Sequence, residues 1–263
     1  MKRTGVEVPQ IARPLLNAFL RYIDFYMGRR FHAVRLAKSG RPAPPPEMPL
    51  LVCLNHPSWW DPLFALLLSR CVFPGRSHYA PMESKALANY GFFRKLGFFG
   101  IEPGTVSGAK TFLEMGQAIL NHPACALWVT AQGTFVDARQ RPVELRSGIG
   151  HLLHRTGRCM VLPLALEYAF WNESTPEALA RFGDPVMVEN GADSPAAEWT
   201  ARIAAALERA QDQLARDAAA RDPKAFDNLL AGGAGVGGVY DLWRRAKARL
   251  RGREFQAAHG GDF

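Results

Sequence analysis

The sequence has few cysteines, and their positions exclude a disulfide framework. Four cysteines occur in 263 residues, each within or beside an apolar run, and none has CxxC spacing. A secreted domain held by disulfides has a much higher density of cysteines, and a zinc site needs them clustered. We therefore expect reduced cysteines buried in a core: Cys53, Cys71, Cys125 and Cys159.

Long apolar runs are also missing. The best candidate, LFALLL, has six residues, far short of the ~18 needed for a helix that spans a membrane. The first residues, MKRTGVEVPQIARPLL, contain no continuous apolar segment and no small-residue cleavage site. These features predict a protein that neither spans a membrane nor carries a secretory signal, and that stays in the cytoplasm.

Acidic residues are scarce at both ends of the chain. The sequence has 32 Lys and Arg against 24 Asp and Glu, and residues 1–41 alone contain nine basic and two acidic residues. Residues 238–253 contain six basic residues and one acidic residue. Basic ends favour an anionic partner, and the aromatic and aliphatic residues between the arginines favour a membrane surface over nucleic acid. The alternative for the N-terminal segment is an apolar face that covers the protein core.

The hydrophobic pattern divides the chain into four parts. Apolar residues at helical spacing predict a basic amphipathic helix over residues 11–38, within an N-terminal, membrane-associating region of residues 1–41. A proline-rich linker follows at 42–48, and the main domain occupies 49–221. Residues 222–263 are predicted to be a glycine-hinged tail with a second basic helix.

Short β-rich runs alternate with helical patterns through the main domain. Strands are predicted at LLVCLN, SHYAPM, FFGIE, CALWVTA, CMVLPLALEY and PVMVE, with helices from Pro62, Glu83, Ser107 and Ser147 and over residues 195–220. Such alternation is typical of parallel sheets covered on both faces. We therefore predict a single α/β domain with a mostly parallel sheet flanked by helices, plus basic amphipathic helices at the N-terminal and C-terminal ends.

The stretch NHPSWWDP, residues 55–62, lies between a predicted strand and a predicted helix. On a regular α-helix, residues five positions apart point about 140° away from each other, so His56 and Asp61 would not meet. The proline after each of them disfavours helical geometry at that position. The stretch therefore predicts a strand end, an irregular turn that folds the carboxylate back onto the imidazole, and a helix beginning at Pro62 with Asp61 as its N-cap.

Two interpretations of this turn remain open. In the first, Asp61 binds one ring nitrogen of His56 and leaves the other free to take a proton from a bound hydroxyl. In the second, Asp61 only caps the helix and His56 packs as a polar residue at the strand end. No metal site is predicted, because one histidine and one carboxylate leave a coordination shell incomplete.

NHPSWWDP resembles the NHxSxxD block, the HX4D signature, of the glycerolipid acyltransferases related to bacterial 1-acylglycerol-3-phosphate acyltransferase. Three later stretches are similar to further blocks of that family, in the same order: GFFRKLGFFGIEPGT, WVTAQGTFVDARQRPVELRSG and VLPLALEY. The resemblance covers roughly residues 49–190. It implies transfer of a fatty acyl group, without a cofactor, from a thioester of coenzyme A or acyl carrier protein to a hydroxyl of a lyso-lipid acceptor. With the basic ends, it implies a peripheral protein at the cytoplasmic face of the inner or plasma membrane.

The resemblance also implies roles for individual residues. His56 is expected to be the general base and Asp61 its orienting partner. Backbone N–H groups near Gly133-Thr134 are expected to stabilise the tetrahedral oxyanion. The residues expected to bind substrate, of which the first two also support the turn, are Asn55, Ser58, Glu102, Gln132, Gly133, Thr134 and Arg146.

Two positions depart from the family pattern. The second block has Pro103, after Glu102, where the family has an arginine. The third block reads Gln132-Gly133-Thr134-Phe135 where the family has Glu-Gly-Thr-Arg. The family's charged groups are associated with the phosphate of a glycerol-phosphate acceptor, and proline and phenylalanine cannot replace a guanidinium. We therefore expect an acceptor without a simple phosphomonoester, unless a phosphate site is restored by Arg139, Arg141 or Arg146, the last of which lies where family members often have a lysine.

The same departures keep a second class of function open. An acyltransferase-like protein can bind a lipid or a partner enzyme without turnover, and the altered third block, at Gln132 and Phe135, is the reason to consider this. The intact pair of His56 and Asp61 argues against it, because a non-catalytic protein has no chemical need for that pair.

Overall fold

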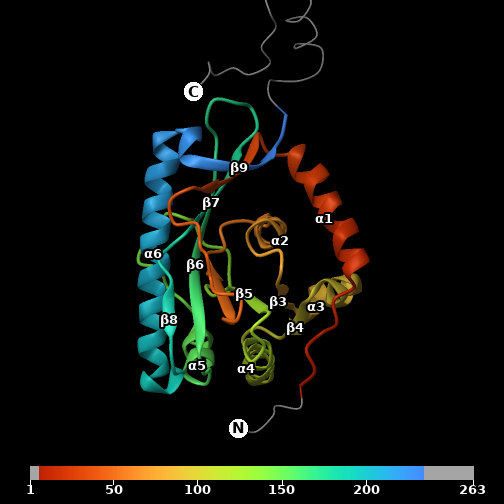
Figure 1. Ribbon diagram of the computed structural model, residues 1–263, viewed down its shortest axis with the longest axis vertical. Coiled ribbons are helices and arrows are strands. Elements are labelled where there is room, and N and C mark those ends of the chain that lie inside the picture. Colours follow the sequence, from red (N-terminus) through yellow and green to blue (C-terminus); the bar gives the residue numbers. More distant parts are fainter. Residues whose placement is uncertain (1–5, 234–263) are drawn as a thin grey trace, which may run out of the picture.

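A nine-stranded sheet with helices on both faces forms the body of the protein, as the computed structural model describes for residues 6–233 (Figure 1). The strand order is β4-β3-β5-β2-β6-β7-β1-β9, with β8 beside β6. The pairs from β4 to β6 and the pair β7–β1 are parallel, whereas β6–β7, β6–β8 and β1–β9 are antiparallel. The predicted single α/β domain with a mostly parallel sheet is confirmed.

The strands are short except for one in the centre of the sheet. Their bounds are β1 Ala33–Ala37, β2 Leu50–Leu54, β3 Ser77–Glu83, β4 Phe98–Ile101, β5 Cys125–Thr130, β6 Cys159–Ala169, β7 Glu177–Phe182, β8 Val186–Val188 and β9 Phe226–Ala231. β6 pairs with β2 from Leu50↔Met160 to Leu54↔Leu164 and then continues past it. The last residues of β6 therefore lie beside the chain that leaves β2.

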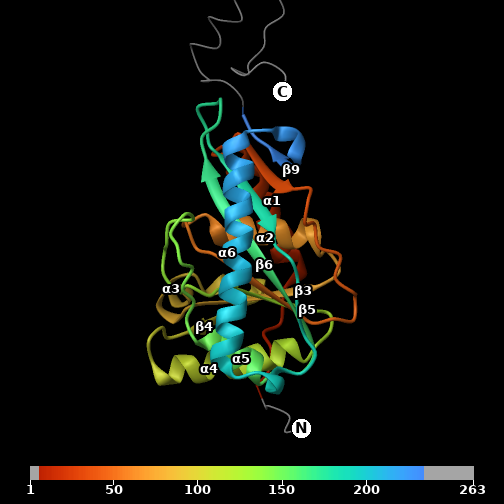
Figure 2. The ribbon, with the colours of Figure 1, turned by 90° about the vertical axis from the view of Figure 1, so that its left-hand side faces the viewer.

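Helices cover the two faces of the sheet unequally. α1 (Arg13–Gly28) and α2 (Asp61–Val72) lie on one face, and α4 (Val106–Leu120), α5 (Gly148–His154) and α6 (Ala196–Ala220) on the other. α6 runs along the length of the sheet, as Figure 2 shows. The short helices α3 (Ser84–Asn89) and η1 (Gly91–Leu96) flank β4, and single turns form η2 (Gly191–Asp193) and η3 (Pro223–Ala225).

The core has one part on each face of the sheet, and β2 contributes to both. Leu50, Val52 and Leu54 pack with α1 and α2, whereas Leu51 and Cys53 pack with α4, α5 and α6. Successive side chains of a strand point to opposite faces, so a strand buried on both sides needs an unbroken apolar run such as LLVCL. Each fully buried leucine contributes about 1.5–3 kcal/mol to folding.

The prediction of one helix over residues 11–38 is wrong in its second half. The helix ends at Gly28, and the predicted helical segment 33–37 is strand β1, which lies between β7 and β9 inside the sheet. β1 is buried throughout, and its one charge, on Arg35, is bound at 2.8 Å by Glu177. Strand β9 likewise belongs to the sheet and not to a separate tail.

Helix α1 covers the core with part of its apolar face. Leu20, Ile23 and Met27 are buried, whereas Tyr22 and Phe25 are exposed. The helix therefore covers the protein core, as the alternative to a membrane-associating helix predicts. It also exposes two large aromatic side chains to solvent. The predicted second basic helix, in residues 238–253, lies outside the described residues. Within residues 6–233, no helix has the length and apolar content needed to cross a bilayer.

The proline-rich linker is fixed by an arginine. The guanidinium of Arg76 donates hydrogen bonds of 2.6–3.2 Å to the carbonyl oxygens of Pro45, Pro46 and Met48 and one of 2.7 Å to Pro123. Burial lowers the pKa of Arg76. Consecutive prolines leave their carbonyl groups without the partners of a helix or sheet, and Arg76 supplies those partners.

Candidate active site

The turn that contains NHPSWWDP lies where the carboxyl ends of β5, β2 and β6 meet. β2 ends at Leu54, which pairs with Thr130 of β5 and Leu164 of β6, and α2 begins at Asp61 with Pro62 in its first turn. In open α/β sheets, the edge formed by the carboxyl ends of the strands is the usual place for a ligand. Residues from three separate parts of the sequence are brought together here.

The predicted contact between Asp61 and His56 is present. His56 Nδ1 lies 2.6 Å from Asp61 Oδ2, and the Asp61 side chain is fully buried. The same oxygen accepts a hydrogen bond of 3.0 Å from the backbone N–H of Ser58, and Oδ1 accepts one of 2.7 Å from the hydroxyl of Tyr168. The carboxylate is therefore held by three donors from two elements.

The capping role predicted for Asp61 is not observed. Trp60 occupies the N-cap position and makes no side-chain cap, and Asp61 is the first residue of α2. Its carboxylate receives the N–H of Ser58, which precedes the helix, in place of an amide of the first turn. The side chain of Ser58 instead accepts from the N–H of Trp60 at 3.3 Å. The carboxylate is thus used inside the turn.

The hydrogen bond to Asp61 assigns the two nitrogens of the His56 ring. A carboxylate only accepts, so Nδ1 carries the proton and Nε2 is left with a lone pair. Within residues 6–233, Nε2 makes no hydrogen bond, and the His56 ring lines the large cavity described below. This arrangement suits a group that removes a proton from a molecule bound in that cavity.

Three side chains that were expected to bind substrate hold the protein together instead. The Asn55 amide is fully buried and exchanges two hydrogen bonds with the backbone of Leu166 on β6, at 3.0 and 2.8 Å. Gln132 Oε1 accepts from the N–H of His56 at 3.1 Å. Ser58 belongs to the turn, as above. None of the three lines the cavity, and together they fix the backbone on which His56 is carried.

A cavity of about 970 Å³ extends from His56 between α2, β3, β5 and α4. Exposed side chains mark its mouth, among them Trp59, Val106 and Phe135, and buried apolar side chains form its inner wall: Leu54, Leu66, Leu96, Phe98 and Trp128. Its volume is near the upper end of the ~300–1,000 Å³ typical of small-molecule sites. The wall is mostly apolar, so the cavity suits a long hydrocarbon group.

His78 is a polar residue of this wall to which the sequence patterns did not point. Trp128 Nε1 donates to His78 Nδ1 at 3.0 Å, and His78 Nε2 lies 3.0 Å from the carbonyl oxygen of Phe73. Burial lowers the pKa of His78 to about 4. The ring is therefore neutral near pH 7, and both of its nitrogens are satisfied by the protein.

Arg146 and Glu102 are the predicted charged residues at the cavity, and both are exposed. Arg146 lies against Gly133, which has a φ of +71°, and a Cβ at Gly133 would overlap the Arg146 side chain. Glycine is therefore needed both for the backbone angle and for the passage of the arginine. Within residues 6–233, Arg146 forms no ion pair, and its side chain lines the cavity.

One of the two amides proposed for the oxyanion is occupied. The N–H of Gly133 donates to the carbonyl oxygen of Thr130 at 3.0 Å, which closes the turn after β5. The prediction that it helps to bind an oxyanion is therefore wrong for this conformation. The N–H of Thr134 has no acceptor among the described residues, and Thr134 lines the cavity.

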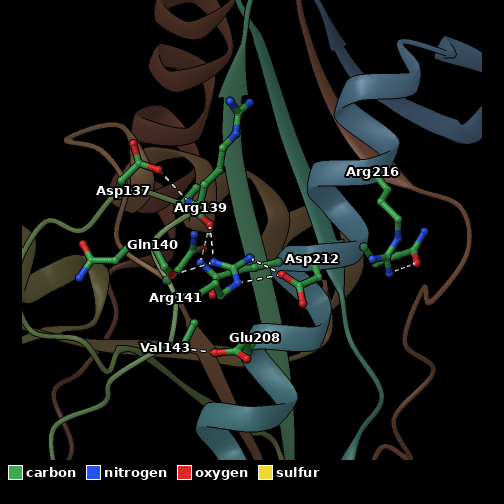
Figure 3. Close-up of polar contacts among 12 residues, drawn as sticks. Asp137, Arg139, Gln140, Arg141, Val143, Glu208, Asp212 and Arg216 are labelled. Atoms are coloured by element: carbon green, nitrogen blue, oxygen red, sulfur yellow. Dashed lines mark hydrogen bonds and ion pairs between the residues drawn. The ribbon is translucent and has the colours of Figure 1, made fainter.

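The other two arginines considered for a phosphate site are bound elsewhere. Arg139 Nη2 lies 2.6 Å from the buried Glu167, and Arg141 forms hydrogen bonds of 2.7–2.8 Å with Asp212 of α6. Figure 3 shows the Arg141 guanidinium between Asp212 and its own loop, where it also donates to the carbonyl oxygens of Ala138 and Gln140 at 3.0 and 2.8 Å. Neither arginine lines the cavity. Among the three, Arg146 remains the candidate for an anion.

Two comparisons by sequence find no relative, since no protein-family model and no curated protein matches the chain. A comparison of structures finds a similar fold in 1-acyl-sn-glycerophosphate (LPA) acyltransferase, PlsC, from Thermotoga maritima, with a TM-score of 0.50 and 14% sequence identity. The match covers 77% of this chain and 82% of that one. The α/β architecture is thus shared with a glycerolipid acyltransferase.

Proposed function

We propose that the protein is an O-acyltransferase that moves a fatty acyl group from an acyl thioester to a hydroxyl of a lyso-lipid or a lipid-like alcohol. One observation carries the proposal: His56, bound through Nδ1 to Asp61, lines a mostly apolar cavity, and its Nε2 makes no hydrogen bond within residues 6–233. A base beside a hydrocarbon-sized cavity fits a reaction between a hydroxyl and a fatty acyl group. The fold shared with a glycerolipid acyltransferase supports the same reaction class.

The proposed step needs no protein nucleophile and no cofactor. The acceptor oxygen attacks the thioester carbonyl carbon while its proton passes to His56 Nε2, and the Asp61 carboxylate stabilises the imidazolium that forms. A tetrahedral oxyanion results, for which the N–H of Thr134 is the available backbone donor. The intermediate collapses with release of the thiolate, and the imidazolium returns the proton to that sulfur.

The acyl chain is proposed to occupy the inner part of the cavity. The buried wall is mostly apolar, and the His78 ring within it is neutral near pH 7 and hydrogen-bonded through both nitrogens. An apolar chain loses no hydrogen bonds on entering such a space and gains about 25 cal/mol per Å² of buried apolar surface. The thioester can belong to coenzyme A or to acyl carrier protein. In both donors the acyl chain is attached through a sulfur, so the chain can enter the cavity while the rest of the donor stays outside.

The acceptor is proposed to lack a simple phosphomonoester. Phe135 stands beside the base, Pro103 lines the cavity near Glu102, and two of the three nearby arginines are neutralised by carboxylates. The one remaining cation, Arg146, is opposed by the negative charge of Glu102 at the same mouth. A neutral or glycosylated lyso-lipid fits this charge balance better than a dianionic phosphate does.

Peripheral binding to the cytoplasmic face of an anionic membrane completes the proposal. Exposed aromatic side chains, here called the aromatic surface, are Tyr22, Phe25, Trp59, Tyr90 and Phe92. Ring contacts of 5.3–5.5 Å connect Trp59 through Trp60 and Tyr26 to Tyr22, so the surface reaches from the cavity mouth to α1. Arg29 lies over the Phe25 ring at 5.4 Å. Aromatic rings with adjacent arginines suit the headgroup region of a bilayer.

The direct test is acyl transfer measured by lipid mass spectrometry. Purified protein is given acyl-coenzyme A and acyl carrier protein thioesters with a panel of phosphorylated and non-phosphorylated lyso-lipids on liposomes. Transfer by the wild type, lost in His56→Ala and retained in His151→Ala, is the expected result, because His151 is an exposed histidine of α5 outside the cavity.

A second function remains to be separated from the first, since Gln132 and Phe135 replace charged residues of the resembled family. If the protein binds lipid without turnover, the wild type and His56→Ala should bind acyl chains and liposomes equally well. Binding without any transfer, by folded protein and over the whole panel, would favour that function.

A further inference from the structure

Tyr168 is the one residue of β6 that binds the carboxylate of Asp61. Its hydroxyl donates a hydrogen bond of 2.7 Å to Asp61 Oδ1, across 107 positions of sequence. We propose that Tyr168 is a positioning residue, whose hydroxyl fixes the Asp61 carboxylate and thereby the orientation and tautomer of His56. The effect of Tyr168 on the reaction rate rests on the proposed function, whereas its effect on the His56 ring rests on the geometry alone.

The three donors divide the two oxygens of the carboxylate between them. Oδ2 accepts from His56 Nδ1 and from the N–H of Ser58, both of which belong to the turn. Oδ1 accepts from Tyr168 alone within the described residues, and Tyr168 belongs to the sheet. Within residues 6–233, the tyrosine is therefore the only side chain that ties the carboxylate to an element outside its own turn.

The position of Tyr168 is itself well fixed. Two residues earlier on β6, Leu166 exchanges two hydrogen bonds with the Asn55 side chain, which sets the register of the turn against the strand. The Tyr168 ring packs against Phe31 and Phe64, with ring centroids 5.7 and 6.3 Å away. A side chain held in this way transmits the position of the strand to the carboxylate.

Tyr168 acts as a donor over the whole working range of pH. Burial and the negative charge of Asp61 raise the pKa of its hydroxyl well above the usual value. The residue does not line the cavity, so its hydroxyl does not meet a substrate directly. Any effect of Tyr168 on the reaction must therefore pass through Asp61 and His56.

Removal of the hydroxyl would leave a buried carboxylate oxygen without a donor. The carboxylate can then rotate or exchange its two oxygens, and Nδ1 of His56 no longer has one fixed acceptor. A neutral imidazole without that acceptor populates both tautomers, and only the form with a free Nε2 can act as the base.

The test is Tyr168→Phe, with two measurements of different kinds. We expect kcat to fall about 10-fold with KM changed by less than about 2-fold, a smaller loss than the ~10²–10⁴-fold that general-base catalysis supplies. In Asp61→Asn protein, adding Tyr168→Phe should cause no further loss. The ¹⁵N spectrum of the His56 ring should change from a single tautomer with the proton on Nδ1 to a mixture. Trp171→Phe is the matched control, since it also removes one hydrogen bond, of 3.1 Å to Ala218 of α6, and Trp171 does not line the cavity.

Each outcome decides the matter. If Tyr168→Phe lowers only the thermal stability, as Trp171→Phe would, and leaves kcat and the His56 spectrum unchanged, the positioning role is refuted while the acyl transfer stands. If the wild type transfers no acyl group, the ¹⁵N spectrum alone decides the positioning role. If Tyr168→Phe does not fold, 3-fluorotyrosine at position 168 keeps the shape and strengthens the donor. The His56 Nδ1 proton must then shift, and an unshifted resonance would refute the inference.

Discussion

The Phe135 ring packs against the His56 imidazole, with ring centroids 4.4 Å apart and an angle of 42° between their planes. The resembled acyltransferases have an arginine where this chain has Phe135. An apolar ring beside the base leaves no bidentate donor for a phosphate at this point. The contact therefore places an apolar ring, and no guanidinium, beside His56.

Replacing Phe135 by arginine should widen the range of acceptors. We expect Phe135→Arg to raise kcat/KM for a lyso-lipid with a phosphomonoester about 10-fold relative to a neutral lyso-lipid, because a charge-assisted hydrogen bond contributes ~1.5–3 kcal/mol. The measurement is the ratio of the two kcat/KM values, with Phe135→Leu as the control. An unchanged ratio would mean that Phe135 does not select the acceptor.

Gly133→Ala should damage the site by displacing Arg146. A Cβ at position 133 overlaps the Arg146 side chain, and the positive φ adds about 1–3 kcal/mol of backbone strain. Gly104→Ala is a matched control, since Gly104 has a φ of +78° but no atom within 4 Å of an added Cβ. We expect similar losses of thermal stability and a larger loss of acyl transfer for Gly133→Ala. Equal effects on transfer would assign the role of Gly133 to the backbone alone.

Asn55→Leu should destabilise the whole domain. The substitution leaves the N–H and C=O of Leu166 buried without partners, at about 1–3 kcal/mol for each group. We expect the free energy of unfolding, measured in urea, to fall by about 2–5 kcal/mol. Asn121→Leu, at an exposed position, should change it by less than about 0.5 kcal/mol. A small loss for Asn55→Leu would show that the turn can be rebuilt without the amide.

His78 should make the stability depend on pH between about pH 6.5 and 4. Its folded pKa of about 4 lies below the ordinary 6.5, so below pH 6.5 the unfolded state binds the proton first and stability falls as the pH falls. The linkage amounts to about 2 kcal/mol between pH 7 and pH 5. Urea unfolding of wild type and His78→Gln at both pH values isolates this contribution, because carboxylates act alike in the two proteins. If both proteins lose the same stability between pH 7 and pH 5, His78 is excluded as the source of this pH dependence.

The aromatic surface should carry membrane binding. We expect Tyr22→Ala combined with Phe25→Ala to weaken flotation with anionic liposomes about 10-fold or more, through loss of buried apolar area. Phe170→Ala is the matched control, because Phe170 is 64% exposed, close to the 62% of Phe25, but lies after β6 and outside the aromatic surface. Binding that survives in high salt for the wild type and is lost only in the double variant is the expected pattern. A purely salt-sensitive interaction would point to charge alone.

The sequence predicted the elements whose pattern is local. β2 was found because LLVCL is an unbroken apolar run, and α6 because its alanine-rich segment has no breaker. β1 was mistaken for helix, since AVRLA is too short to show a period of two and its arginine is paired only in the folded sheet. β7, EALARF, and β9, FDNLLA, were missed because their sequences have weak strand propensity; β9 also pairs only with β1, which lies far away in the sequence.

The site divides in the same way. His56 and Asp61 are five positions apart and each precedes a proline, so their contact could be predicted from one short stretch. The bonds of Tyr168 to Asp61 and of Asn55 to Leu166 join positions 107 and 111 residues apart, and no spacing rule in one sequence reveals them. The occupied amide of Gly133 was also out of reach, since it depends on how the turn after β5 closes.

The place of β1 between β7 and β9 sets a limit on how the protein can be shortened and on the order in which it folds. A fragment of residues 49–221 would lack both β1 and β9 and would expose the edge of β7 as a template for aggregation. β1 pairs with β7 as well as with β9, and its pairing with β9 closes a loop of most of the chain, so we expect that pairing to form late in folding.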